Sequence, residues 1–92
     1  MNLNFVKDAQ GKWVAEFEAS SDFNLHLERA VLSEVEVFQK TAGSEFARVG
    51  GFPSHVAYMK VVDYDFSGVV YPKAIKIVTD TQPGTAIVTF VA

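Results

Sequence analysis

The fold is decided by residues 74–91, which read AIKIVTDTQPGTAIVTFV. Two β-branched, largely apolar runs flank a short polar segment that ends in Pro83-Gly84. Pro followed by Gly suits the two central positions of a type II turn, so we expect residues 74–79 and 85–91 to form a hairpin. The second strand is apolar on both faces. A strand of that kind would aggregate at a free edge, so it should be central in its sheet or covered by a neighbouring subunit.

Apolar and polar side chains also alternate with a period of two in the N-terminal third of the chain. Leu3 and Phe5 share one face of a first strand. Residues 13–19 and 23–28 each place apolar side chains on one face and polar side chains on the other, which is typical of half-buried strands. Asp, Gly and Ser residues lie between these segments and indicate turns.

The middle of the chain predicts a second hairpin. Residues 34–40 and 45–49 flank a Thr-Ala-Gly-Ser turn, and the valines of the first run favour a strand over a helix. One helical turn near residues 30–33 stays open as an alternative start of this segment. The Gly- and Pro-containing residues 50–54 predict a loop, and the β-branched residues 56–62 predict a central strand.

Short strands at regular spacing, without a long helix, are typical of sandwiches and small barrels. We expect about seven or eight of them. The sequence therefore predicts an all-β fold, namely a single antiparallel β-sandwich or jelly-roll-like barrel. The length of 92 residues accommodates one domain, residues 1–92.

The composition restricts the partners. The chain carries 8 basic and 11 acidic side chains, a net charge of -3, whereas a dedicated nucleic-acid binder should be basic. It has no cysteine, which excludes disulfides, thiol nucleophiles and zinc–cysteine sites. Lys7 and Asp8 interrupt the first apolar run, so we expect no signal peptide and synthesis in the cytoplasm. The longest charge-free stretch, residues 81–92, is shorter than the roughly 20 residues that span a bilayer, so we expect no membrane span.

Surplus apolar side chains predict self-association. Hydrophobic residues make up 49% of the chain and aromatic residues 13%, and a chain this short cannot cover all of its rings. We therefore expect a homo-oligomer that buries apolar surface between copies. The residues expected at this interface belong to the C-terminal hairpin and its rim: Tyr71, Ile75, Ile77, Val88 and Phe90.

A metal-dependent or hydrolytic enzyme is one alternative. His26 and Glu28 lie on the same side of one predicted strand, and they would cluster with Glu16 and Glu18 if the two strands pair. A solvated polar face is the preferred interpretation. Asp63 and Asp65 are a second carboxylate pair, which we interpret as turn-capping residues.

No serine lies in a nucleophile-elbow motif and no Gly-rich phosphate loop is present. The sequence therefore predicts no catalytic residue, no cofactor and no metal.

Aromatic residues give a second alternative, a carbohydrate-binding module on the same sandwich. Its stacking platform would use Trp13, Tyr58 or Tyr64. The tyrosines are expected to be half-exposed, because a phenolic hydroxyl needs a polar partner or water. Trp13 shares an alternating apolar face with Phe17, which favours core packing for it.

Several segments resemble known proteins: residues 13–18, residues 23–29, Asp65-Phe66 and residues 71–77. They are similar to small all-β proteins encoded among structural genes of tailed phages and prophages of gut bacteria. The resemblance extends over most of the chain. It implies a virion-associated β-sandwich of the capsid-decoration or head-fibre type that works as a symmetric oligomer in a larger assembly. It implies no catalytic residues.

Overall fold

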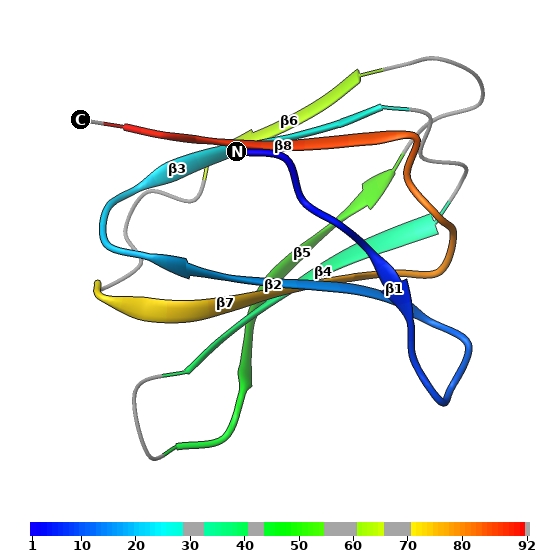
Figure 1. Cartoon of the computed structure of the whole chain (residues 1–92), viewed down its shortest axis with the longest axis horizontal. Coiled ribbons are helices and arrows are strands. Elements are labelled where there is room, and N and C mark those ends of the chain that lie inside the picture. Colours follow the sequence, from blue (N-terminus) through cyan, green and yellow to red (C-terminus); the bar gives the residue numbers. More distant parts are fainter. Residues whose placement is uncertain (29–32, 41–43, 55–60, 66–70, 92) are drawn as a thin grey trace.

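The chain folds into two antiparallel sheets that form two layers (Figure 1). The computed structural model describes residues 1–28, 33–40, 44–54, 61–65 and 71–91. One sheet has the strand order β1-β2-β7-β4-β5 and the other has the order β6-β3-β8. The strands are β1 (Val6–Lys7), β2 (Trp13–Ala19), β3 (Phe23–Glu28), β4 (Ser33–Lys40), β5 (Ala47–Ser54), β6 (Val61–Asp65), β7 (Lys73–Thr79) and β8 (Thr85–Phe90). The predicted all-β sandwich is confirmed.

The N-terminal segment belongs to both sheets. The Met1 amino group donates to the Val88 carbonyl oxygen over 2.8 Å, and the Val88 amide donates back to the Met1 carbonyl oxygen over 2.8 Å. The Leu3 amide donates to the Ala86 carbonyl oxygen, also at 2.8 Å. The segment thus lies along β8 and then crosses the edge of the sandwich, where β1 pairs with β2. It closes one side of the molecule (Figure 1).

The strand pairs are nested. The N-terminal segment pairs with β8, β2 with β7, β3 with β6, and β4 with β5. This is the order produced when one long hairpin rolls up, and it is the connectivity of a jelly roll. Because distant segments pair in this way, most contacts join residues that are far apart in the sequence. Local turn signals therefore do not determine which strands pair.

The predicted C-terminal hairpin is wrong. β7 pairs with β2 and β4, whereas β8 pairs with β3, so the two strands lie in different sheets. Residues 80–84 connect the layers instead of reversing the chain within one layer. The physical reason is burial, because Ile75 and Ile77 of β7 and Val88 of β8 are all buried in the same core cluster between the sheets. A Pro-Gly turn indicates that the chain changes direction, but it does not determine which strand pairs with the one that follows the turn.

Some of the other predicted strands and loops also differ from the structure in their boundaries. The hairpin between residues 34–40 and 45–49 is confirmed as β4 and β5, with a bulge between Val37 and Phe38. The predicted loop 50–54 is instead part of β5, an edge strand in which Pro53 is tolerated. The predicted central strand 56–62 is described only from Val61, where β6 forms an edge. Residues 29–32, and with them most of the alternative helical turn, lie outside the described residues.

The core is a layer of small and aliphatic side chains between the sheets. Its positions follow the predicted alternation, with Phe23, Leu25 and Leu27 of β3 fully buried and Leu3, Phe5 and Phe17 packed against them. The other members of the cluster are Ala19, Val35, Val37, Ile75, Ile77, Ala86 and Val88. Inward faces of three strands in the larger sheet (β2, β4 and β7) and two in the smaller (β3 and β8) therefore supply the hydrophobic stabilisation.

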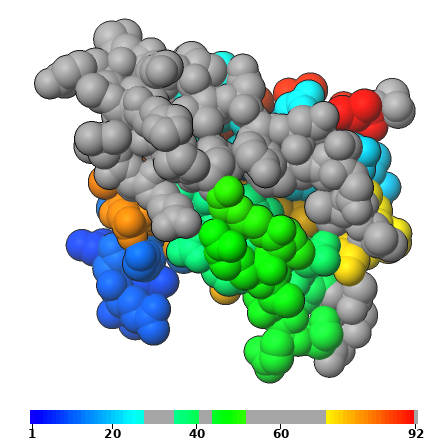
Figure 2. All heavy atoms as spheres, turned by 180° about the vertical axis from the view of Figure 1, so that it is seen from behind, coloured from blue at the N-terminus to red at the C-terminus, as the bar shows by residue number. Residues whose placement is uncertain are grey.

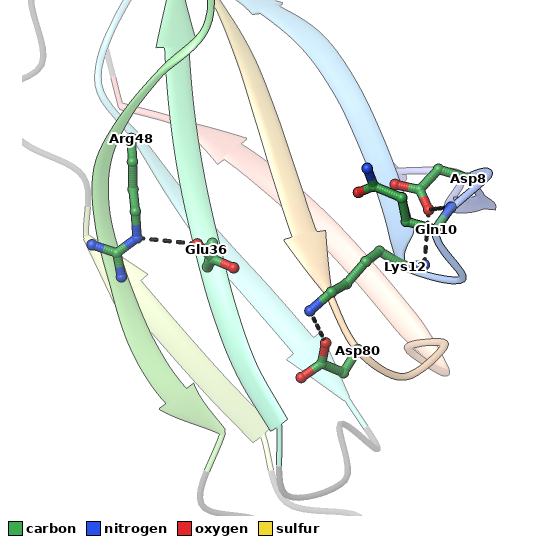
Figure 3. Close-up of polar contacts among 6 residues, drawn as sticks. All are labelled: Asp8, Gln10, Lys12, Glu36, Arg48 and Asp80. Carbon is green, nitrogen blue, oxygen red and sulfur yellow. Dashed lines mark hydrogen bonds and ion pairs between the residues drawn. The ribbon is translucent and has the colours of Figure 1, made fainter.

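A polar turn closes one end of the larger sheet. Asp8 Oδ1 accepts hydrogen bonds from the amides of Gln10 and Lys12, each at 2.9 Å, and Gly11 takes a φ of 81° that favours glycine. Lys12 then reaches Asp80 at the end of β7 (Figure 3). The hydrogen bond to Asp80 raises the pKa of Lys12. The contact thus stabilises the fold fully below pH 10.5 and is lost as the pH rises through the raised pKa.

Truncation of the central core should be costly. We expect Leu25→Ala to lower the free energy of unfolding by about 2–5 kcal/mol, because Leu25 is fully buried and the sheets cannot close the cavity. Val6, which is 65% exposed, is the control, and Val6→Ala should change stability by less than about 0.5 kcal/mol. Urea unfolding of both variants measures the difference. Equal costs would show that the two sheets do not share this core.

Candidate functional site

Four aromatic rings meet at one end of the sandwich, and we call them the aromatic cluster. The Phe17 and Phe23 ring centroids lie 5.2 Å apart at an interplanar angle of 84°. Phe90 lies 6.3 Å from both rings, and Tyr71 lies 6.3 Å from Phe23. All four contacts are edge-to-face, which is a favoured arrangement of aromatic pairs. At this end β2 passes into β3 and β8 ends (Figure 1).

The aromatic cluster runs from the core to the surface. Phe23 is fully buried, Tyr71 is half-buried, and Phe90 is 39% exposed. Val91 follows with 45% exposure, and its amide donates to the Asp22 carbonyl oxygen at 2.8 Å. The end of the chain is therefore held beside the rings. The result is an apolar rim, Phe90 and Val91, that is positioned by buried neighbours.

The structure divides the residues predicted for an interface. Ile75, Ile77 and Val88 are at most 1% exposed and pack inside their own chain, so their side chains cannot reach a second copy. Ile75 and Ile77 lie on the one face of β7 that packs against the other sheet, and Val88 lies on the inward face of β8. Phe90 lies at the surface end of the aromatic cluster, whereas Tyr71 is half-buried against Phe23. A self-association interface on β8 would therefore be formed at the end of the strand that carries Phe90.

The predicted stacking platform is not assembled by the described residues. Trp13 is half-buried at the start of β2, opposite Thr79 of β7. Tyr64 occupies β6 opposite Leu25 of β3, in the other sheet. Tyr58 lies outside the described residues.

The proposed His26 cluster is separated by the topology. β2, which carries Glu16 and Glu18, and β3, which carries His26 and Glu28, lie in different sheets. The register places Asp63 opposite His26 instead. Among the described residues, no three His, Asp or Glu side chains are close enough to hold a metal ion.

A shallow depression lies where the N-terminal segment passes the connection between β7 and β8. Its volume is about 200 Å³. None of the residues that line it is titratable, so the depression offers amides and apolar carbon but no acid or base. The lining residues are Leu3, Asn4, Phe5, Gln82, Pro83, Gly84 and Ala86.

The sequence analysis missed a second cluster, on the outer face of the larger sheet. The Lys76 ammonium lies 4.8 Å from the Phe38 ring centroid and 4.6 Å from that of Phe46. The Lys40 ammonium lies 4.7 Å from the same Phe46 centroid. We call these four residues the lysine–aromatic patch. The only indication of this patch in the sequence is that Phe38 and Lys40 lie two residues apart and so share one face of β4. Lys76 lies beside them because β4 pairs with β7, and the sequence did not predict that pairing.

An ion pair borders the lysine–aromatic patch. Arg48 Nε on β5 donates to Glu36 Oε2 on β4 at 3.1 Å (Figure 3). The guanidinium extends over Gly51, where an added Cβ would overlap it and would lie 3.2 Å from the Val35 carbonyl oxygen. Gly51 thus leaves space for Arg48. Gly50, the neighbouring residue, has nothing within 4 Å of an added Cβ.

These two glycines form a matched test of the ion pair. Both substitutions to alanine reduce the entropy of the unfolded chain equally, but only Gly51→Ala displaces Arg48 from Glu36. We expect Gly51→Ala to be less stable than Gly50→Ala by roughly 0.2–1 kcal/mol, the range for an exposed ion pair. Urea unfolding at low and high salt measures the difference. Equal stability at low salt would contradict this role of Gly51.

Comparison of the chain with protein-family models, curated proteins and solved structures finds no match. Within the described ranges there is no helix with the length and apolar character needed to cross a bilayer. Functional inference therefore rests on the two clusters described above.

Proposed function

We propose that this protein is a non-enzymatic structural domain that self-associates through its aromatic end. The observation that carries the proposal is the exposure of Phe90, whose ring contacts the half-buried Phe17 and the fully buried Phe23, with the exposed Val91 next to it in the sequence. Isolated apolar residues are common on surfaces and need no explanation. Here, however, Phe90 continues an aromatic cluster from the core out to the solvent.

The geometry suits a binding anchor. The Phe90 ring is held edge-to-face by Phe17 and Phe23, so it loses little conformational freedom when a partner covers it. Rigid aromatic side chains next to apolar neighbours are typical of interaction hot spots. Complete burial of an exposed Phe side chain contributes about 1.5–3 kcal/mol, and because Phe90 is 39% exposed, covering the rest of it contributes roughly 1 kcal/mol per copy. In a closed symmetric oligomer that contribution is repeated at every interface.

The proposed role is that of a virion-associated protein of the capsid-decoration or head-fibre type within a larger protein assembly. The resemblance of residues 13–18 and 23–29 to such proteins supports it. Jelly-roll sandwiches are widely used in viral capsids, which makes the fold compatible with this role. The acidic composition favours protein partners over nucleic acid. The proposal places synthesis in the cytoplasm and assigns no cofactor.

A charge at the rim should separate the copies. We expect Phe90→Asp to weaken self-association at least about thirtyfold, because the carboxylate would be buried without a partner. Thr85→Asp is the matched control, since Thr85 is exposed at the opposite end of the same strand, away from the aromatic cluster. Sedimentation equilibrium of both variants gives the dissociation constants, and circular dichroism checks that each remains folded.

A third variant keeps the test decisive if Phe90→Asp fails to fold. Val91 is exposed and contributes no ring to the aromatic cluster, so Val91→Asp should fold normally. It should also weaken association, by roughly tenfold or more. If folded Phe90→Asp and Val91→Asp associate as tightly as Thr85→Asp, the aromatic end is not the interface.

A further inference from the structure

The outer face of the larger sheet carries charges of both signs on separate strands. In register, Glu16 of β2 lies opposite Lys76 of β7, and Lys76 lies opposite Phe38 of β4. In the next row, Glu18 lies opposite Ala74, and Ala74 lies opposite Lys40. Directly opposed residues of neighbouring strands share a face. Acceptors therefore occupy one half of this face and ammonium groups the other.

The two lysines of the lysine–aromatic patch are positioned by aromatic rings, and neither forms an ion pair with a described carboxylate. Both ammonium groups lie within 4.7 Å of the Phe46 centroid, and Lys76 also contacts Phe38. Among the described residues, no carboxylate forms an ion pair with Lys40 or Lys76. The rings restrict the ammonium groups and leave N–H donors directed elsewhere. Two fixed and unpaired positive charges on one face form a binding site for an anionic group.

The opposite half of the face supplies only acceptors. Glu16 and Glu18 are exposed, and no described cation pairs with either carboxylate. A ligand that covers both halves must bring an anionic group to the lysines and hydrogen-bond donors to the glutamates. An oligosaccharide in which one acidic sugar is joined to neutral sugars has this combination of a single anionic group and several hydroxyl donors.

The turn after β1 lies beside this face. In Figure 1 it extends beyond β2 and β7, and Figure 2 shows it in blue as a lobe separate from the green β5.

We propose that this face binds an oligosaccharide that carries an isolated carboxylate. The carboxylate binds Lys40 and Lys76, and the hydroxyls of neighbouring neutral sugars donate to Glu16 and Glu18. A polyanion such as a heavily sulfated glycan fits less well, because the two glutamates repel it. An extended acidic peptide fits less well too, because its backbone would pair with a sheet edge and not with a sheet face.

An NMR titration of the ¹⁵N-labelled full chain tests the proposal with defined probes. 3′-Sialyllactose should shift the amides of Lys40, Phe46 and Lys76, with millimolar affinity and fast exchange. Lactose, which lacks the carboxylate, should bind at least tenfold more weakly. A heparin tetrasaccharide should bind no more tightly than sialyllactose.

Variants assign the binding to these residues. Lys40→Gln and Lys76→Gln should each weaken sialyllactose binding roughly tenfold, because each removes one charge-assisted hydrogen bond. Lys7→Gln is the control with the same change of charge. Lys7 is exposed and lies opposite Trp13, so it is not on the Glu16 face. Both site lysines are surface residues, so the variants should fold, as their urea midpoints will show.

Four results would overturn the proposal. The first is the absence of any shift with sialyllactose. The second is equal binding of lactose, which would make the carboxylate irrelevant. The third is tighter binding of the heparin tetrasaccharide, which would indicate a polyanion site. The fourth is that the Lys40→Gln and Lys76→Gln variants bind sialyllactose as strongly as the Lys7→Gln variant does.

Discussion

The packing of one sheet onto the other through a single aliphatic layer is the constraint on which the rest of the structure depends. Leu25 and Leu27 of β3 are buried in one cluster with Ile75 and Ile77 of β7, and all four are fully buried. Each short strand supplies only a few inward positions, and these are occupied mainly by branched side chains. Among the described residues, Phe38, Phe46 and Phe90 have their rings outside this layer, and these rings belong to the two candidate surfaces.

The two surfaces are built from different parts of the chain. The aromatic cluster joins β2, β3 and β8 with Tyr71, and it depends on the core directly because Phe23 belongs to both. The lysine–aromatic patch joins β4 and β7 with Phe46, on the far side of the larger sheet. One face can therefore hold a second copy while the other remains open, as a multivalent assembly requires.

The sequence pattern predicted where the strands lie better than it predicted which strands pair. Alternation identified β2 and β3 and the inward position of Phe23, because burial on one face imposes a period of two. The Pro83-Gly84 signal gave the wrong partner for β8, since pairing in a jelly roll is decided by contacts between distant segments. For the same reason Lys76 and Phe46 could not be linked in advance. Phe90 was predicted at the interface, and it remains a prediction.

The measurement closest to the central claim is the absolute mass of the unmodified chain in solution. Size-exclusion chromatography with light scattering, repeated over a hundredfold dilution, gives this mass without a shape assumption. Self-association through the aromatic end predicts a discrete multiple of the 10.1 kDa chain that falls only at the lowest concentrations. A mass of 10.1 kDa throughout the series would contradict the account.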